Sequence, residues 1–94
     1  MRFEWDENKN AINKQKHGIS FETARLVFFD PYRKEYYDEA HSDIDEDRWI
    51  TIGKAGNILF VVYVEKEYGN VIRLISARKA TPEERRDYYG DGEN

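Results

Sequence analysis

Cysteine is absent from this 94-residue chain, and proline occurs only twice. The lack of cysteine excludes disulfide scaffolds, thiolate metal sites and cysteine nucleophiles. No apolar run approaches the ~18 residues that a transmembrane helix needs, and the first residues show no apolar signal core. We therefore expect a single domain spanning residues 1–94, working in a reducing cytoplasm, because this length leaves no room for a second hydrophobic core.

Basic residues are outnumbered by acidic ones, 15 to 19, which gives a formal net charge of −4. This balance is unusual for a protein that binds nucleic acid. The charges are unevenly spread, however: residues 8–21 hold three lysines and no acid, residues 35–47 hold seven acids and no base, and residues 71–86 hold five bases and two acids. We expect separate basic and acidic surfaces, although an ordinary solvated face is an alternative interpretation of the acidic segment.

The residue patterns predict helices in the first third of the chain and strands after it. Strands are predicted over residues 2–5, 33–39, 48–54, 58–65 and 71–79, and helices over 7–17, 21–29 and 82–89. Asp6, Ser20 and Thr81 are good N-terminal caps, Gly18 stands where a helix should end, and Pro31 stops the second helix. We expect the tail, residues 90–94, to fray.

This order predicts an α+β fold. A helical hairpin should cover one face of a small antiparallel sheet of three to four strands, with a short strand before it and a helix after it. Residues 58–65 are almost entirely apolar, which indicates a central strand buried on both faces. We expect the other face of the sheet to be partly open and to serve as a binding surface.

Basic and histidine side chains form three groups along the chain. They are Lys9, Lys16 and His17; His41, Ser42 and Arg48; and Arg73, Ser76, Arg78, Lys79, Arg85 and Arg86. Cations directed at one place can hold a phosphodiester and stabilise its developing charge, and an adjacent imidazole can move a proton. That combination would allow RNA cleavage without a metal ion, by attack of the ribose 2′-hydroxyl on its own phosphate.

Each of these residues also has a plainer interpretation. Arg73 and Arg78 should point to opposite faces of a strand unless a bulge intervenes, so one of them would be a structural arginine paired with a carboxylate. Arg85 would lie on a solvated helix face, and His17 would only interact with a helix C-terminus. His41 stands at the mouth of the acidic segment, and its role stays open.

A metal site is the weakest of the candidate sites. His41, Asp43, Asp45 and Asp47 alternate like the ligands of a calcium loop. The glycine and the final bidentate glutamate of such a loop are missing at the required offsets. We expect neither a metal ion nor another cofactor.

An ordered set of motifs nevertheless spans almost the whole chain. They are Trp5-Asp6-x-x-Lys9, Asn13, Lys16-His17-Gly18, Phe21, Asp30-Pro31, His41-Ser42-Asp43, Arg48, Arg73-x-x-Ser76-Ala77-Arg78-Lys79-Ala80 and Glu84-Arg85-x-x-Tyr88. Over about residues 2–89 this set resembles the BrnT family of toxins from bacterial type II toxin–antitoxin systems. The resemblance implies a fold similar to RelE-type ribonuclease toxins and a ribonuclease that inhibits translation without a metal.

The resemblance also implies partners and site residues. The partners would be an RNA substrate and a BrnA-like ribbon-helix-helix antitoxin, with operator DNA reached only through that antitoxin, no membrane, and a heterotetramer of two toxins and two antitoxins. The implied catalytic residues are His41, Arg48, Arg73 and Arg78, and the implied RNA-binding residues are Lys9, Lys16, His17, Lys79 and Arg85. The alternatives are a non-catalytic co-repressor that binds the antitoxin, and an unrelated, metal-dependent α+β enzyme.

Overall fold

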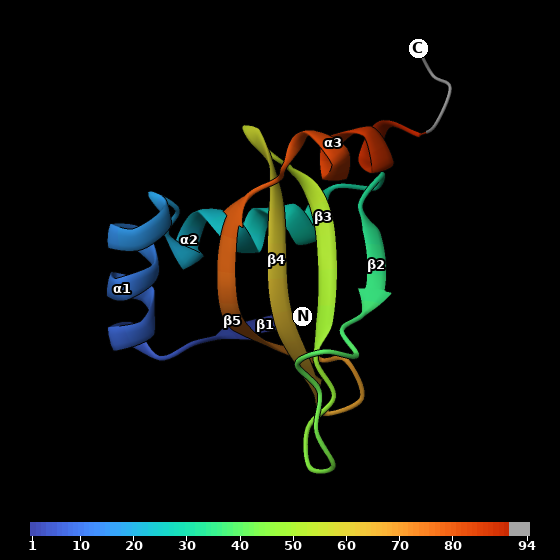
Figure 1. Cartoon of the computed structure of the whole chain (residues 1–94). Helices are drawn as coiled ribbons and strands as arrows, with labels where there is room; N and C mark the ends of the chain where they lie inside the picture. The colour runs from blue at the N-terminus through green and yellow to red at the C-terminus, as the bar shows by residue number, and fades with distance from the viewer. Residues whose placement is uncertain (91–94) are drawn as a thin grey trace.

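The computed structural model describes residues 1–90, and Figure 1 shows the arrangement of their helices and strands. In chain order the elements are β1 (Arg2–Glu4), α1 (Glu7–His17), α2 (Phe21–Ala24), the 3-10 helix η1 (Arg25–Phe29), β2 (Lys34–Tyr37), β3 (Trp49–Ala55), β4 (Asn57–Lys66), β5 (Val71–Lys79) and α3 (Pro82–Tyr89). Within this range no helix has the length and apolar character needed to cross a membrane. The predicted fraying concerns residues that, apart from Gly90, lie outside the described range.

The strands form one five-stranded mixed sheet in the order β1-β5-β4-β3-β2. β2 to β5 pair antiparallel, whereas β1 pairs parallel with β5. The expected antiparallel strands are thus present as β2 to β5, but the sheet is mixed and has one more strand than the three to four expected, because the N-terminal strand joins it beside a segment that lies far away in the sequence. A short polar and aromatic alternation identifies a strand but carries no information about its partner.

Helices lie on both faces of this sheet. α1 packs along the part of β5 that continues past its pairing with the short β1. α2 and η1 lie behind the strands in the view of Figure 1, and α3 crosses one end of the sheet. The larger hydrophobic core lies between the sheet and α2 with η1; it comprises chiefly Phe21, Val27, Phe28, Leu59, Val61, Tyr63 and Leu74. A smaller cluster, Ile52, Ile58 and Tyr88 with Ile50, Phe60 and Ala80, joins α3 to the opposite face. The rest of that face stays accessible.

The helix ends follow the predicted capping residues. The side chain of Asp6 accepts hydrogen bonds from the backbone of α1, and Gly18 adopts the left-handed conformation at φ 73° that ends this helix. Thr81 and Glu84 form a reciprocal capping box at the start of α3. The second helix differs from its prediction, because it is α-helical only to Ala24 and continues as η1. Val27 is β-branched and Phe28 and Phe29 are aromatic, and such residues lower α-helix propensity and are compatible with the tighter turn.

A β-bulge in β5 decides which side chains share a face. Val62 lies opposite Ser76 but Tyr63 lies opposite Leu74, so β5 contains one additional residue, Ile75, at this point. Arg73, Ser76 and Arg78 consequently lie opposite Val64, Val62 and Phe60, which alternate along one face of β4. Arg73 and Arg78 therefore lie on the same face and not on opposite ones, because the bulge that the expectation allowed for is present. We call the face that carries these three residues the open face.

Candidate functional site

A pocket of about 290 Å³ lies on the open face, between the end of α1, the loop before β3, and strands β3 to β5. Its lining residues are His17, Asp38, His41, Ile50, Phe60, Val62, Ser76, Ala77 and Arg78. The pocket therefore brings both histidines of the chain together with one of the predicted catalytic arginines. Its floor is apolar and its rim carries the groups able to transfer protons or bind an anion.

His41 is held by a buried carboxylate. Its Nδ1 lies 2.9 Å from Oδ2 of Asp38, and because a carboxylate oxygen accepts, this contact calls for the tautomer with the hydrogen on Nδ1. The backbone N–H of His41 also donates to that carboxylate. The Asp38 side chain is 6% exposed and the His41 side chain 68% exposed. Because the hydrogen of Nδ1 points at Asp38, the neutral ring carries its lone pair on Nε2. The pair can therefore accept a proton at a defined atom.

Asp38 is a site residue that the sequence analysis did not single out. It belongs to the seven acids of residues 35–47, whose composition predicts only an acidic surface. Its backbone N–H donates to the carbonyl of Arg48 over 2.8 Å, which turns the chain after β2 and places the carboxylate inside the loop. The spacing Asp-x-x-His, three residues apart, was the only signal in the sequence that could have indicated this contact.

Arg78 is fixed in place by α3. Its Nη1 and Nη2 donate to the two carboxylate oxygens of Glu84 over 2.8 and 3.0 Å, and its guanidinium carbon lies 4.0 Å from the centre of the Phe60 ring. The hydrogen bond from Arg78 is the largest of the effects that lower the pKa of Glu84 below its usual value. A bidentate ion pair combined with stacking on an aromatic ring restricts the guanidinium to one orientation. A third of its side chain stays exposed toward the open face.

Arg73 and Arg48 do not line this pocket. Nη1 of Arg73 lies 3.4 Å from the Glu4 carboxylate, which also accepts from Lys66 over 2.9 Å. Arg73 and Lys66 border a separate hollow that is also lined by the acidic residues 45–47. The hydrogen bond from Lys66 is the largest of the effects that lower the pKa of Glu4. Arg48 is paired with Glu46 over 3.2 Å. Of the four predicted catalytic residues, the structure thus brings together His41 and Arg78 and places the two others elsewhere.

A second hollow adjoins the pocket along α1. Its lining residues are Lys9, Ile12, Asn13, Lys16, His17, Ile75 and Ser76, so it shares His17 and Ser76 with the pocket. Lys9, Lys16 and His17, all predicted to bind RNA, therefore border one continuous surface that leads to Arg78. Lys79 lies opposite Leu59, on the face of the sheet that α2 and η1 cover. Arg85 is exposed on α3, and neither residue borders this surface.

A buried asparagine positions α1 beside the pocket. The side-chain nitrogen of Asn13 donates to the carbonyl oxygens of Ile19 and Ala77, each over 2.8 Å, and its oxygen accepts from the backbone N–H of Ala77 over 3.1 Å. Ala77 lies between Ser76 and Arg78 on β5. This contact fixes the distance between the helix that carries His17 and the strand that carries Arg78.

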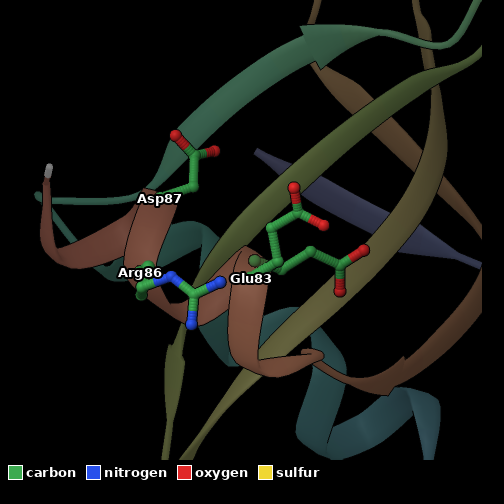
Figure 2. A pocket seen from close by; sticks show the side chains of 4 residues that line it. Glu83, Arg86 and Asp87 are labelled. Atoms are coloured by element: carbon green, nitrogen blue, oxygen red, sulfur yellow. The ribbon is translucent and has the colours of Figure 1, made fainter.

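Another hollow lies on α3 and has a different character. Its lining residues are Glu83, Glu84, Arg86 and Asp87, and Figure 2 shows the three labelled side chains extending from this one helix. Three carboxylates against one guanidinium make it unsuitable for a phosphate group. Within residues 1–90 there is no group of three or more His, Cys, Asp or Glu side chains placed to hold a metal ion.

Comparisons with known proteins agree with the resemblance seen in the sequence. The model of the family "Ribonuclease toxin, BrnT, of type II toxin-antitoxin system" matches residues 5–84. The 1.1 Å crystal structure of the Brucella abortus ribonuclease toxin, BrnT, is 31% identical and superposes with a TM-score of 0.68, covering 86% of this chain and 97% of that one. No curated protein sequence matches the chain. The chain therefore belongs to the BrnT family of ribonuclease toxins of type II toxin–antitoxin systems.

Proposed function

We propose that this toxin cleaves RNA without a metal ion, and that the reaction takes place in the pocket on the open face. The observation that carries the proposal is the convergence of His17, His41 and Arg78, from three separate segments, on one pocket. Imidazole and guanidinium together supply proton transfer and charge stabilisation, which are the two requirements of phosphodiester transesterification.

In the proposed reaction the ribose 2′-oxygen attacks the adjacent phosphorus. The bond from O2′ to phosphorus forms, the bond from phosphorus to O5′ breaks, and the products are a cyclic phosphate and a 5′-hydroxyl. Arg78 stabilises the negative charge that develops on the non-bridging oxygens, because Glu84 and Phe60 hold its guanidinium in place before the substrate arrives. The apolar side chains of the floor offer a surface for a nucleobase.

The cations around the pocket would bind the rest of the RNA strand. Lys9 and Lys16 border the adjoining hollow and are placed to contact phosphates next to the one that is cleaved. The pocket and the adjoining hollow are lined by none of the other predicted cations, Arg48, Arg73, Lys79 and Arg85. Their proposed contribution is to attract RNA electrostatically rather than to act on the reacting bond. Strong salt dependence of RNA binding is expected from this arrangement.

The remaining features of the proposal follow from family membership. Cleavage would inhibit translation in the cytoplasm, the fold would be of the RelE type, and the neutralising partner would be a BrnA-like ribbon-helix-helix antitoxin. Two toxins and two antitoxins would form a heterotetramer that represses its own operator through the antitoxin. The acidic loop, residues 43–47, is a surface of suitable charge for a basic segment of that antitoxin.

Induction of the chain alone in a bacterium tests the proposal. We expect growth arrest with breakdown of total RNA, both lost in Arg78→Gln and retained in Arg86→Gln, which removes an exposed cation of α3 outside the pocket. Cleavage of RNA by the purified chain should continue in excess EDTA. Normal growth with a folded, soluble protein would contradict the proposal and favour the non-catalytic co-repressor. Loss of cleavage in EDTA would contradict the metal-free mechanism.

A further inference from the structure

The two histidines of the pocket are held in different ways. His41 lies in the loop before β3, and its Nδ1 is bound by the buried carboxylate of Asp38. His17 is the last residue of α1, is half-buried, and its ring makes no hydrogen bond within residues 1–90. Both line the same pocket, and His17 also lines the adjoining hollow that holds Lys9 and Lys16. This asymmetry indicates two different tasks.

The geometry of His41 suits a proton acceptor. With its Nδ1 hydrogen directed at Asp38, the neutral ring has its lone pair on Nε2, and the carboxylate stabilises the imidazolium that forms once Nε2 takes a proton. Asp38 lines the pocket, but its side chain is only 6% exposed and its carboxylate is engaged by the ring of His41. Asp38 is therefore a positioning residue that acts through His41.

The geometry of His17 suits a proton donor. Its ring has no carboxylate partner, and it stands at the C-terminal end of α1, where the partial negative charge of the helix interacts favourably with a cationic side chain. Within residues 1–90 the ring has no hydrogen-bond partner, so its nitrogens are available to the substrate. Ser76, on β5, lines the pocket and the adjoining hollow together with this histidine, and Arg78 lines the pocket.

We propose that the two histidines divide the proton transfers of RNA cleavage, with His41 as the general base and His17 as the general acid. Nε2 of His41 takes the proton of the 2′-hydroxyl as the bond from O2′ to phosphorus forms. Protonated His17 gives its proton to O5′ as the bond from phosphorus to O5′ breaks, so charges and atoms balance. This inference rests on the proposed ribonuclease function and assigns the residues that carry it out.

Substrates with a modified leaving group separate the two roles. In an RNA oligonucleotide whose scissile O5′ is replaced by sulfur, the leaving group departs as a thiolate and needs no proton, because a thiol is far more acidic than an alcohol. The full chain and its variants are assayed on the ordinary oligonucleotide and on its sulfur-bridged counterpart. His17→Ala should lose about 10²–10⁴-fold in kcat on the ordinary substrate and stay close to the unmodified chain on the sulfur-bridged one.

The base variant should behave differently. His41→Asn keeps a side-chain N–H for Asp38 but lacks the second ring nitrogen, so its loss should be similar on both substrates. Gln15→Ala, an exposed neighbour of His17 on α1, is the matched control and should cleave both substrates normally. Circular dichroism melting curves verify that each variant is folded, and His17→Gln replaces His17→Ala if the latter is not.

Each outcome separates this inference from the proposed function. Equal losses of the His17 variant on both substrates, or no loss on either, would overturn the assignment of the general acid while leaving the ribonuclease proposal intact. Full activity of His41→Asn would overturn the assignment of the base. A wild-type chain that cleaves neither substrate would refute the proposed function itself.

Discussion

Replacing the buried Asn13 by alanine should destabilise the protein and loosen α1 from the sheet. Asn13 is 6% exposed, and its side-chain amide makes three hydrogen bonds, two to Ala77 of β5 and one to the carbonyl of Ile19. Alanine can make none of them, and the backbone groups of Ala77 and Ile19 that it abandons are themselves buried. The perturbation therefore acts on a buried contact that connects α1 to β5 beside the pocket.

The magnitude follows from the number of bonds. A buried hydrogen bond contributes about 1 kcal/mol net, so the loss of three lowers the free energy of unfolding by about 3 kcal/mol. That is a large share of the roughly 5–15 kcal/mol of a typical domain. For a chain of this size each kcal/mol lowers the melting temperature by about 4–8 °C, so a decrease of about 12–24 °C is expected.

Urea denaturation, followed by circular dichroism, measures the effect. Asn8→Ala is the matched control, since Asn8 lies on the exposed side of the same helix, and its cost should stay within about 0.5 kcal/mol. A loss below about 1 kcal/mol for Asn13→Ala, or an equal loss for both variants, would refute the reasoning that these three bonds hold α1 in place.

Three further predictions concern α3 and the core. Glu84→Gln keeps the acceptor of the capping box but removes the charge that holds Arg78, so it should cost about 1 kcal/mol at pH 7. Because the pKa of Glu84 is lowered in the folded state, the difference in free energy of unfolding between the chain and Glu84→Gln should disappear as the pH falls through the folded pKa. Urea denaturation at several pH values measures this difference, and a difference that does not change with pH would contradict the prediction. The hydrogen bond to Asp87 raises the pKa of Tyr36 to about 12, so stability that is complete below pH 10.0 should be lost as the pH rises toward 12. Tyr36→Phe should flatten this alkaline decline in thermal melts; an unchanged decline would count against the contact. In Gly53→Ala the new methyl group would lie 2.6 Å from a side chain of η1, which should cost about 1–3 kcal/mol in urea denaturation, and a neutral result would show that η1 can shift.

The acidic segment, residues 35–47, shows how an acidic chain can carry a cationic site. Its seven acids do not form one surface. Asp38 is buried against His41, while Glu35 accepts from the buried Tyr63 hydroxyl over 2.6 Å. Asp43 caps its own loop by accepting from the backbone of Asp45 and Glu46. The interpretation as a solvated face therefore holds for only part of the segment, and the net charge of the chain says little about the pocket.

Local patterns predicted the secondary structure well. The caps Asp6 and Thr81, the helix-ending Gly18, and the apolar run of β4 all behave as predicted, since each depends on neighbours within a few residues. The family was also recognisable, because its motifs lie in a fixed order along the chain. His41 and Arg78 could be proposed as partners on chemical grounds, but nothing in their spacing placed them in one pocket.

The sequence by itself thus determined the helices and strands, the α+β class, the family and the types of residue able to cleave RNA. The tertiary structure decided which of those residues meet. The parallel pairing of β1 with β5 joins segments about 70 positions apart, and the extra residue Ile75 turns Arg73 and Arg78 to one face. Both result from packing between distant segments, where the free energy depends on contacts that no local pattern encodes.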